Sequence, residues 1–231
     1  MSSINSVPFF YKRSNVSNYG YIRKANTIKY IVVHYTGNAK DTAKGNANYF
    51  ANNVVGNGAH YFVDDDCVYQ SVDDNIIAWH CQSPGMALKC ACRNANSIGV
   101  EMCCSGNYDV SEKTVANTIK VVKYLMNKYN IPSTNVIRHY DVCGKNCPAP
   151  FVKNSSRWNN FKSRLEEGEE KIVKQNIKIN GKIKTVDAIN KDGYTYIKIR
   201  DLSELLEISY NKETKLISVK VKWEGRNAFF F

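Results

Sequence analysis

Apolar positions in the first two thirds of the chain recur with two different periods. Short runs rich in branched and aromatic side chains predict strands, at residues 28–34, 59–63, 67–72, 97–103 and 136–137. Apolar positions spaced three or four residues apart predict helices, at residues 42–52, 111–129 and 155–167. Since strands alternate with helices, the pattern predicts an α/β domain of about 165 residues.

Two segments show neither the strand pattern nor the helix pattern. Residues 1–27 are polar and aromatic and carry no motif, so we expect them to run over the surface of the domain. Residues 81–96, which contain Pro84-Gly85 and several cysteines, predict a long irregular loop. Loops of this kind often border a binding groove.

The composition changes at residues 166–170, where a short acidic stretch predicts a linker. Beyond it, apolar and polar residues alternate around Asn180-Gly181, a pair that favours a hairpin turn. Strands are predicted at 194–199 and 217–223, and a short helix at 201–206. We therefore predict a first domain at 1–165, a linker at 166–170 and a small α+β domain at 171–231.

The composition describes a basic, folded chain. A hydrophobic share of 43% against 23% charged residues is typical of globular proteins. The net charge of +11 extends over both halves and favours a polyanionic partner, such as nucleic acid, an acidic membrane or the anionic polymers of a bacterial wall. No nucleic-acid-binding motif accompanies the charge, so we expect no nucleic-acid partner.

No apolar run approaches the roughly 20 residues that span a bilayer, so we expect no membrane insertion. The N-terminus lacks the charged and apolar regions of a signal peptide, which predicts synthesis in the cytosol. The eight cysteines lack the spacing of a disulfide framework, since Cys103 and Cys104 are adjacent. We expect free thiols.

The candidate chemistry centres on residues 138–150. His139 and Cys147 follow a predicted strand there, and imidazole and thiolate are favoured zinc ligands. Two ligands do not hold a catalytic zinc, and His34, at the end of a buried strand, is the best third candidate. Other residues remain open as alternatives: His60 or His80 in place of His34, and Asp141 or Cys143 in place of Cys147.

Three ligands leave a fourth position open for water, as in catalytic zinc sites. Glu101 interrupts an apolar strand, where a carboxylate is costly to bury without a partner or a task. Beside a metal it would move a proton from water to a leaving amine, and Lys145 would stabilise a developing oxyanion. Together these residues suit metal-assisted amide hydrolysis. The simpler alternatives are an ordinary strand-end histidine at His34 and an ion pair between Glu101 and Arg138.

Five segments occur in order along the first domain: Val32-Val33-His34-Tyr35-Thr36, Gly58-Ala59-His60-Tyr61-Phe62, Ala78-Trp79-His80, Asn96-Ser97-Ile98-Gly99-Val100-Glu101, and Arg138-His139-Tyr140-Asp141 through Lys145-Asn146-Cys147-Pro148. Over residues 25–165 the chain resembles the zinc-dependent N-acetylmuramoyl-L-alanine amidases (amidase type 2, related to peptidoglycan recognition proteins), in particular bacteriophage endolysins. The resemblance implies a mixed central sheet flanked by helices. It also implies a Zn²⁺ cofactor and hydrolysis of the amide bond between N-acetylmuramic acid and L-alanine in peptidoglycan.

The resemblance assigns roles to residues of this chain. The zinc ligands match His34, His139 and Cys147, the catalytic glutamate matches Glu101, and the lysine that stabilises the transition state matches Lys145. His60 matches a structural position, and His80 a position that lines the substrate groove. Ala59 stands where some members have a catalytic tyrosine, which places more weight on Glu101.

Residues 171–223 resemble, less closely, a small domain found in copper amine oxidase N-terminal regions and in bacterial surface proteins, although no His, Cys or Met is present to hold copper. In an endolysin this position normally holds a wall-binding module, with dimerisation as the alternative role. The resemblance implies a protein made in the host cytoplasm that acts on peptidoglycan after release. The alternative function is a non-catalytic peptidoglycan-binding protein of the same fold.

Overall fold

The computed structural model describes most of the chain, which divides into two compact units. The described residues are 2–82, 85–167, 172–179, 182–191, 194–197, 199–203, 206–210 and 217–222. Unit 1 spans Met1–Glu167 and unit 2 spans Gly168–Phe231. Several predicted features lie wholly or partly outside the described residues: residues 168–170 of the linker predicted at 166–170, the hairpin turn Asn180-Gly181, the loop residue Pro84 and the strand end Trp223.

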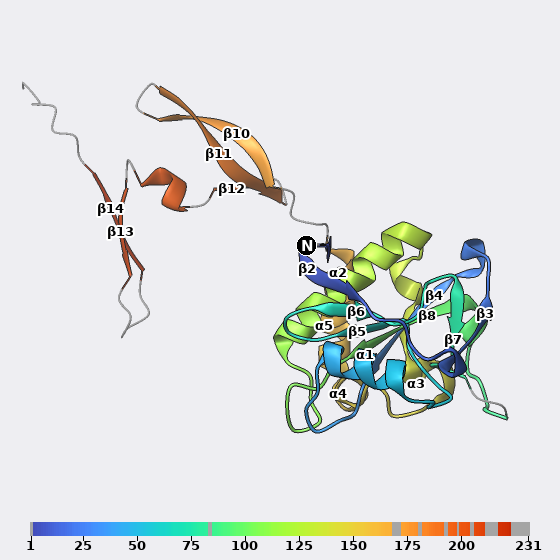
Figure 1. Ribbon diagram of the computed structural model, residues 1–231. Helices are drawn as coiled ribbons and strands as arrows, with labels where there is room; N and C mark the ends of the chain where they lie inside the picture. The colour runs from blue at the N-terminus through green and yellow to red at the C-terminus, as the bar shows by residue number, and fades with distance from the viewer. Residues whose placement is uncertain are drawn as a thin grey trace, which may run out of the picture. The chain divides into compact units, whose positions relative to one another are not determined.

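Unit 1 is built on a seven-stranded sheet (Figure 1). Its strand order is β1 (Ser3–Ile4), β2 (Val7–Tyr11), β6 (Val68–Gln70), β5 (Tyr61–Val63), β8 (Ser97–Met102), β4 (Tyr30–Tyr35) and β9 (Val136–Arg138). Strands β5, β8, β4 and β9 run parallel to one another, whereas β5 and β6 form an antiparallel hairpin. This mixed sheet confirms the predicted α/β fold.

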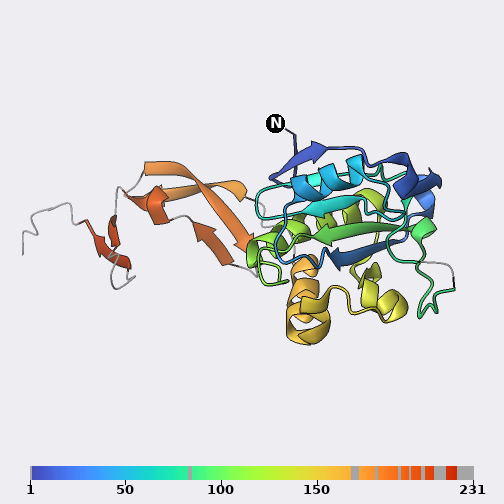
Figure 2. The ribbon, with the colours of Figure 1, turned by 60° about the horizontal axis from the view of Figure 1, so that its bottom comes forward.

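Helices cover both faces of the sheet. On one face, α2 (Glu112–Tyr129) packs on β4, β5 and β8, and α5 (Ser155–Glu166) packs on α2. On the other face, α1 (Ala43–Asn52) packs on β5 and β6, and Figure 2 shows α1 and α5 on opposite sides of the sheet. Thr42 and Ser111 cap α1 and α2, as their hydroxyls accept backbone N–H bonds that the first turn leaves unpaired.

Alternation along β4 and β8 separates the core from the functional face. Ile31, Val33, Ile98 and Val100 belong to the main core beneath α2. Successive side chains of a strand point to opposite faces, so His34 and Glu101 point to the other face, and the parallel register places them directly opposite each other. A buried histidine and a partly buried carboxylate therefore meet at one edge of the sheet.

The prediction for residues 1–27 is wrong. Strands β1 and β2 extend the central sheet, and β3 (Tyr19–Ile22) pairs with β7 (Ile76–Ala78). The anchor is Asn18, which is fully buried: its amide donates to the carbonyls of Phe50 and Asn53, and its carbonyl accepts from two further backbone N–H groups. A polar anchor has no signature in a hydrophobic pattern.

Residues 138–150 contain two short helical segments, α3 (His139–Cys143) and the start of α4 (Ala149–Lys153). The remaining short elements of unit 1 are 3-10 turns: η1 (Val16–Asn18), η2 (Ala25–Thr27), η3 (Asn94–Asn96) and η4 (Ser133–Asn135). Within the part of the chain that the structure describes, no helix has the length and apolarity to cross a membrane.

The described residues of unit 2 form two small antiparallel sheets. One consists of β10 (Ile172–Ile179), β11 (Lys182–Lys191) and β12 (Tyr194–Ile197), and the other of β13 (Leu206–Tyr210) and β14 (Ile217–Val221). The helix expected at 201–206 is instead the 3-10 turn η5 (Ile199–Leu202), and Leu206 opens strand β13.

Candidate metal centre

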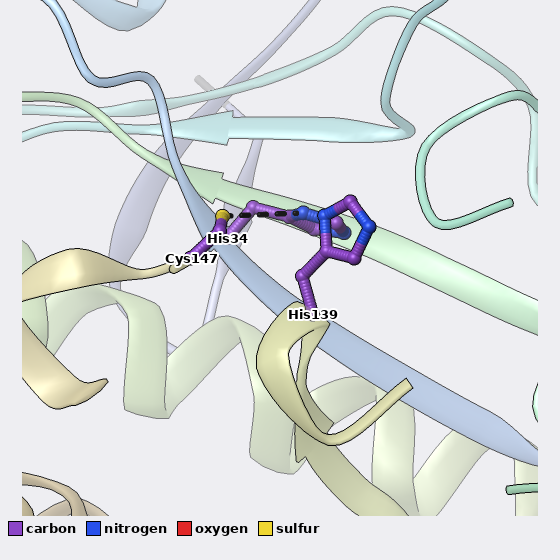
Figure 3. A group of neighbouring side chains, drawn as sticks. All are labelled: His34, His139 and Cys147. Atoms are coloured by element: carbon purple, nitrogen blue, oxygen red, sulfur yellow. Dashed lines mark hydrogen bonds between the residues drawn. The ribbon is translucent and has the colours of Figure 1, made fainter. Parts of the chain in front are cut away.

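Three side chains from distant parts of unit 1 converge at the edge of the sheet. The ligand atoms of His34, His139 and Cys147 all lie within 4.8 Å of one another. Figure 3 shows them entering from the end of β4, the first turn of α3 and the loop before α4. Each residue is at most 4% exposed, and Cys147 Sγ lies 3.7 Å from His34 Nδ1. The sequence predicted these residues as metal ligands, and the structure brings them together.

Unpartnered polar atoms surround this cluster. Among the described residues, both ring nitrogens of His139 and Oε2 of Glu101 are buried and have no hydrogen-bond partner. A buried polar group left unpaired costs about 1–3 kcal/mol, so these atoms are expected to have a ligand. Two imidazoles and one thiol are the donor set that suits zinc. The residues present therefore fit a zinc ion.

Burial keeps the two imidazoles in the form that binds metals. It lowers the pKa of His139 to about 4, with Lys145 adding to the effect. Burial and the neighbouring His139 hold the pKa of His34 well below its usual value. Burial and the charge of Glu101 raise the pKa of Cys147 to about 12. A bound metal cation deprotonates a coordinating thiol, so Cys147 needs such a cation to become a thiolate.

Glu101 stands beside the cluster, with Oε1 3.9 Å from His34 Nδ1. Burial raises the pKa of Glu101 to about 8, and Lys145 partly offsets that effect. Asp41, which sequence reasoning missed, raises it further. The carboxylate of Asp41 accepts hydrogen bonds from Asn38, Asn46 and the Cys104 amide, so it is held in place by its neighbours. A carboxyl with a pKa near neutrality is suited to taking up and releasing a proton.

The cluster lies in a cleft of about 660 Å³. Its walls include Tyr49 and Phe50 of α1, Trp79 after β7, and Lys145, together with Glu101 and the three clustered side chains. Gln82 and Met86 of the long loop also line it, which confirms that this loop borders a groove. The volume is in the range of small-molecule sites.

Two alternative histidines have other partners. His60 accepts a hydrogen bond from the Gly99 amide at Nδ1, and its Nε2 lies 3.0 Å from the carbonyl of Ile76, so neither nitrogen is free. His80 lines the cleft, but its ring nitrogens face His34 and Ser97 at 3.0 and 3.1 Å. Its predicted contact with substrate stays a prediction.

Two alternative ligands in α3 also lie outside the cluster. Asp141 pairs with Arg138 at 2.7 Å, which leaves Glu101 without the arginine partner that the simpler alternative required. The thiol of Cys143 donates to the backbone carbonyl of His139. Arg138 in turn lies over the rings of Tyr140 and Trp158, at 5.2 Å from each ring centre. These contacts hold α3, and with it His139, against the rest of unit 1.

Comparisons with known proteins identify the family of the chain. The sequence profile of a family described as N-acetylmuramoyl-L-alanine amidase matches residues 24–150. The chain is similar to the N-acetylmuramoyl-L-alanine amidase CwlL of Bacillus licheniformis (28% identity over 189 residues, covering 78% of this chain and 52% of CwlL). It is also similar to the N-acetylmuramoyl-L-alanine amidase BlyA of Bacillus subtilis strain 168 (36% identity over 155 residues, covering 62% and 42%). The chain therefore spans about half the length of these curated relatives.

Solved structures resemble the fold. PlyL aligns with a TM-score of 0.59 at 30% identity, and the alignment covers 71% of this chain and 99% of the PlyL chain. The catalytic domain of XlyA aligns with a TM-score of 0.57 at 30% identity, covering 69% of this chain and 99% of that domain.

Proposed function

Because the chain belongs to the N-acetylmuramoyl-L-alanine amidase family, we propose that it hydrolyses the amide bond between N-acetylmuramic acid and L-alanine in bacterial peptidoglycan, as a lytic endolysin. The observation that supports this most is the shared cleft, which holds the two histidines and the cysteine together with Glu101 and Lys145. An amide hydrolase needs an activated water, a proton carrier and a stabiliser of negative charge. The metal ligands, Glu101 and Lys145 are suited to these three functions in that order.

We propose zinc as the metal, held by His34, His139 and Cys147. A bound zinc ion with an open coordination position supplies Lewis acidity, which lowers the pKa of water and polarises a carbonyl oxygen. This role is consistent with the unpartnered nitrogens of His139 and with the high pKa of the Cys147 thiol in the absence of a cation.

Glu101 and Lys145 carry the protein's own part of the reaction. Glu101 accepts a proton from the attacking water as the new C–O bond forms, and passes it to the alanine nitrogen as the C–N bond breaks. A pKa of about 8 allows the carboxyl of Glu101 to act both as a proton acceptor and as a proton donor near neutral pH. Lys145, whose charge acts on Glu101 and His139 across the cleft, stabilises the negative charge that develops on the carbonyl oxygen.

Unit 2 is proposed to bind the cell wall, with dimerisation as the alternative role. The positive charge of the chain, +11 at pH 7, would concentrate it on anionic wall polymers. We further propose synthesis in the host cytoplasm, followed by action on the wall after release.

The test of the proposed function is digestion of purified peptidoglycan with the full chain. New alanine N-termini, detected by amine labelling and mass spectrometry, are expected. Glu101→Gln keeps the shape of the side chain and is expected to reduce their release by about 10²–10⁴-fold, while zinc content stays stoichiometric. Glu112→Gln, at a glutamate side chain that is 74% exposed at the start of α2, is the matched control.

Two outcomes would contradict different parts of the proposed function. Wall lysis by Glu101→Gln at near the wild-type rate, with zinc bound, would show that the assigned proton carrier is wrong. Stoichiometric zinc in the wild-type protein without any new alanine N-terminus would favour the non-catalytic peptidoglycan-binding protein.

A further inference from the structure

A chain of hydrogen bonds runs from the metal cluster into the protein on the far side of His34. His34 Nε2 lies 3.0 Å from His80 Nδ1, and His80 Nε2 lies 3.1 Å from Ser97 Oγ. The Ser97 hydroxyl lies 2.6 Å from the backbone carbonyl of Arg93. His34 is 1% exposed and Ser97 is fully buried, whereas His80 between them is partly buried at the wall of the cleft.

The backbone carbonyl of Arg93, at the end of this series of hydrogen bonds, determines which atom donates in each bond. A carbonyl oxygen only accepts, so the Ser97 hydroxyl donates to Arg93. The oxygen of Ser97 then accepts from His80 Nε2–H. In a neutral imidazole the other nitrogen is an acceptor, so His80 Nδ1 accepts from His34 Nε2–H. Nδ1 of His34 is left with its lone pair, and it is the nitrogen that faces Cys147 and Glu101.

The backbone around His80 is shaped to hold this ring in place. Gly99 lies under the imidazole, and a Cβ on Gly99 would lie 2.6 Å from His80 Cγ, a distance that real Cβ atoms essentially never show. The amide N–H groups of His80 and Cys81 both donate to the side-chain carbonyl of Asn94. Ser97, Gly99 and Glu101 alternate along β8, so they share the face that carries the cluster.

We propose that His80 and Ser97 are positioning residues, which fix His34 in the Nε2–H tautomer and present its Nδ1 lone pair to the metal. This inference rests on the proposed zinc site and assigns His80 a role other than substrate contact. Groups that hydrogen-bond to a ligating histidine set its tautomer and orientation, and their loss typically weakens metal binding about 10- to 100-fold.

The first test needs no mutation. The chain has four histidines, so long-range ¹H–¹⁵N correlation spectra of the metal-free, ¹⁵N-histidine-labelled full chain assign the tautomer of each. We expect the Nε2–H tautomer for both His34 and His80. A proton on Nδ1 of His34, or a mixture of tautomers, would overturn the proposal.

The second test measures zinc affinity by competition with a chromophoric chelator. His80→Leu and Ser97→Ala are expected to weaken binding about 10- to 100-fold, with mixed tautomers at His34. His80→Asn places an amide oxygen where Nδ1 was and is expected to restore most of the affinity. Ser71→Ala is the matched control, because the Ser71 hydroxyl is equally buried and has no hydrogen-bond partner in the described part of the chain.

The outcomes distinguish this inference from the proposed function. Wild-type affinity and a pure Nε2–H tautomer in both His80→Leu and Ser97→Ala would overturn the positioning role and leave the zinc site intact. A wild-type chain that binds no zinc would overturn the proposed function, while the tautomer measurement would still decide whether the hydrogen-bond chain sets the proton on His34.

Discussion

At the scale of single residues, a comparison of Cys143 and Cys147 tests the ligand set of the cluster most directly. Cys147 and Cys143 lie four positions apart, but only Cys147 faces His34, whereas the Cys143 thiol donates to a backbone carbonyl. Since a hydroxyl is a much poorer zinc ligand than a thiolate, we expect Cys147→Ser to lose most of its bound zinc. We expect Cys143→Ser to keep it.

Elemental analysis of the two variants after dialysis against trace zinc measures this difference. Their thermal unfolding without metal checks that both fold. Equal zinc content in the two variants would remove Cys147 from the ligand set and reopen the alternatives that the sequence left, Cys143 and Asp141.

The residues of the cluster could be predicted because each of them interrupts or ends a recognisable sequence pattern. His34 ends an apolar strand, and Glu101 is the one carboxylate in another. The partners of these residues had no such signal. Ser97 and Asp41 act through hydrogen bonds to groups distant in the chain, as Asp41 does with Cys104. Only the folded chain brings those groups together.

At the scale of elements, the hairpin turn between β5 and β6 is tied to the start of α2. Asp65 accepts hydrogen bonds from the hydroxyls of Ser111 and Thr114, and Asn117 donates to two carbonyls of the turn. A carboxylate at a helix N-terminus also interacts favourably with the helix dipole. The contact joins the functional edge of the sheet to the helix that covers its other face.

This contact predicts a pH-dependent stability. Burial tends to raise the pKa of Asp65, but the hydrogen bonds from Ser111 and Thr114 outweigh it, and the net pKa is lowered. A carboxyl with a lowered pKa in the folded state stabilises it fully above the unfolded value of about 3.9, and the stabilisation is lost as the pH falls through the folded value. We expect Asp65→Asn to lower the free energy of unfolding by about 1 kcal/mol at pH 7.

Urea unfolding of wild type and variant at pH 7 and at pH 3 tests this expectation, because the difference between them should shrink at the lower pH. Asp66→Asn is the matched control, since Asp66 is next in the chain, is 84% exposed in its side chain and pairs with the exposed Lys113. A difference of the same size at both pH values would show that the charge of Asp65 does not carry the effect.

Elements were predictable where the chain carries a local signal. The branched runs of β4 and β8, and the caps Thr42 and Ser111, are such signals, and the structure has those elements. The N-terminal strands were not predictable, because β2 is only partly buried and pairs with β6, some sixty residues later. Similarly, α3 is a single turn whose start is fixed by the Arg138–Asp141 pair and not by an apolar stripe.

At the scale of the whole molecule, catalysis and wall binding are expected to separate. The cluster, the cleft and the core that supports them all lie in unit 1. A chain that ends at Glu167 is therefore expected to cleave a soluble muropeptide at close to the rate of the full chain. The same truncated chain should cleave intact walls more slowly, because it lacks the proposed wall-binding unit.

Salt separates the two contributions of unit 2, charge and specific binding. Residues 168–231 hold 13 Lys and Arg against 9 Asp and Glu, a net charge of +4 within the +11 of the full chain, and this charge acts over a Debye length of about 10 Å at 0.1 M salt and about 3 Å at 1 M. If charge alone retains the full chain on walls, sedimentation with purified walls will fall to the level of the truncated chain at 1 M salt. Retention that persists at 1 M salt indicates a binding site in unit 2. Equal sedimentation and equal wall cleavage by both chains at low salt would exclude a wall-binding role for unit 2. Dimerisation would then become the better proposal for unit 2, and sedimentation velocity of the two chains would measure it.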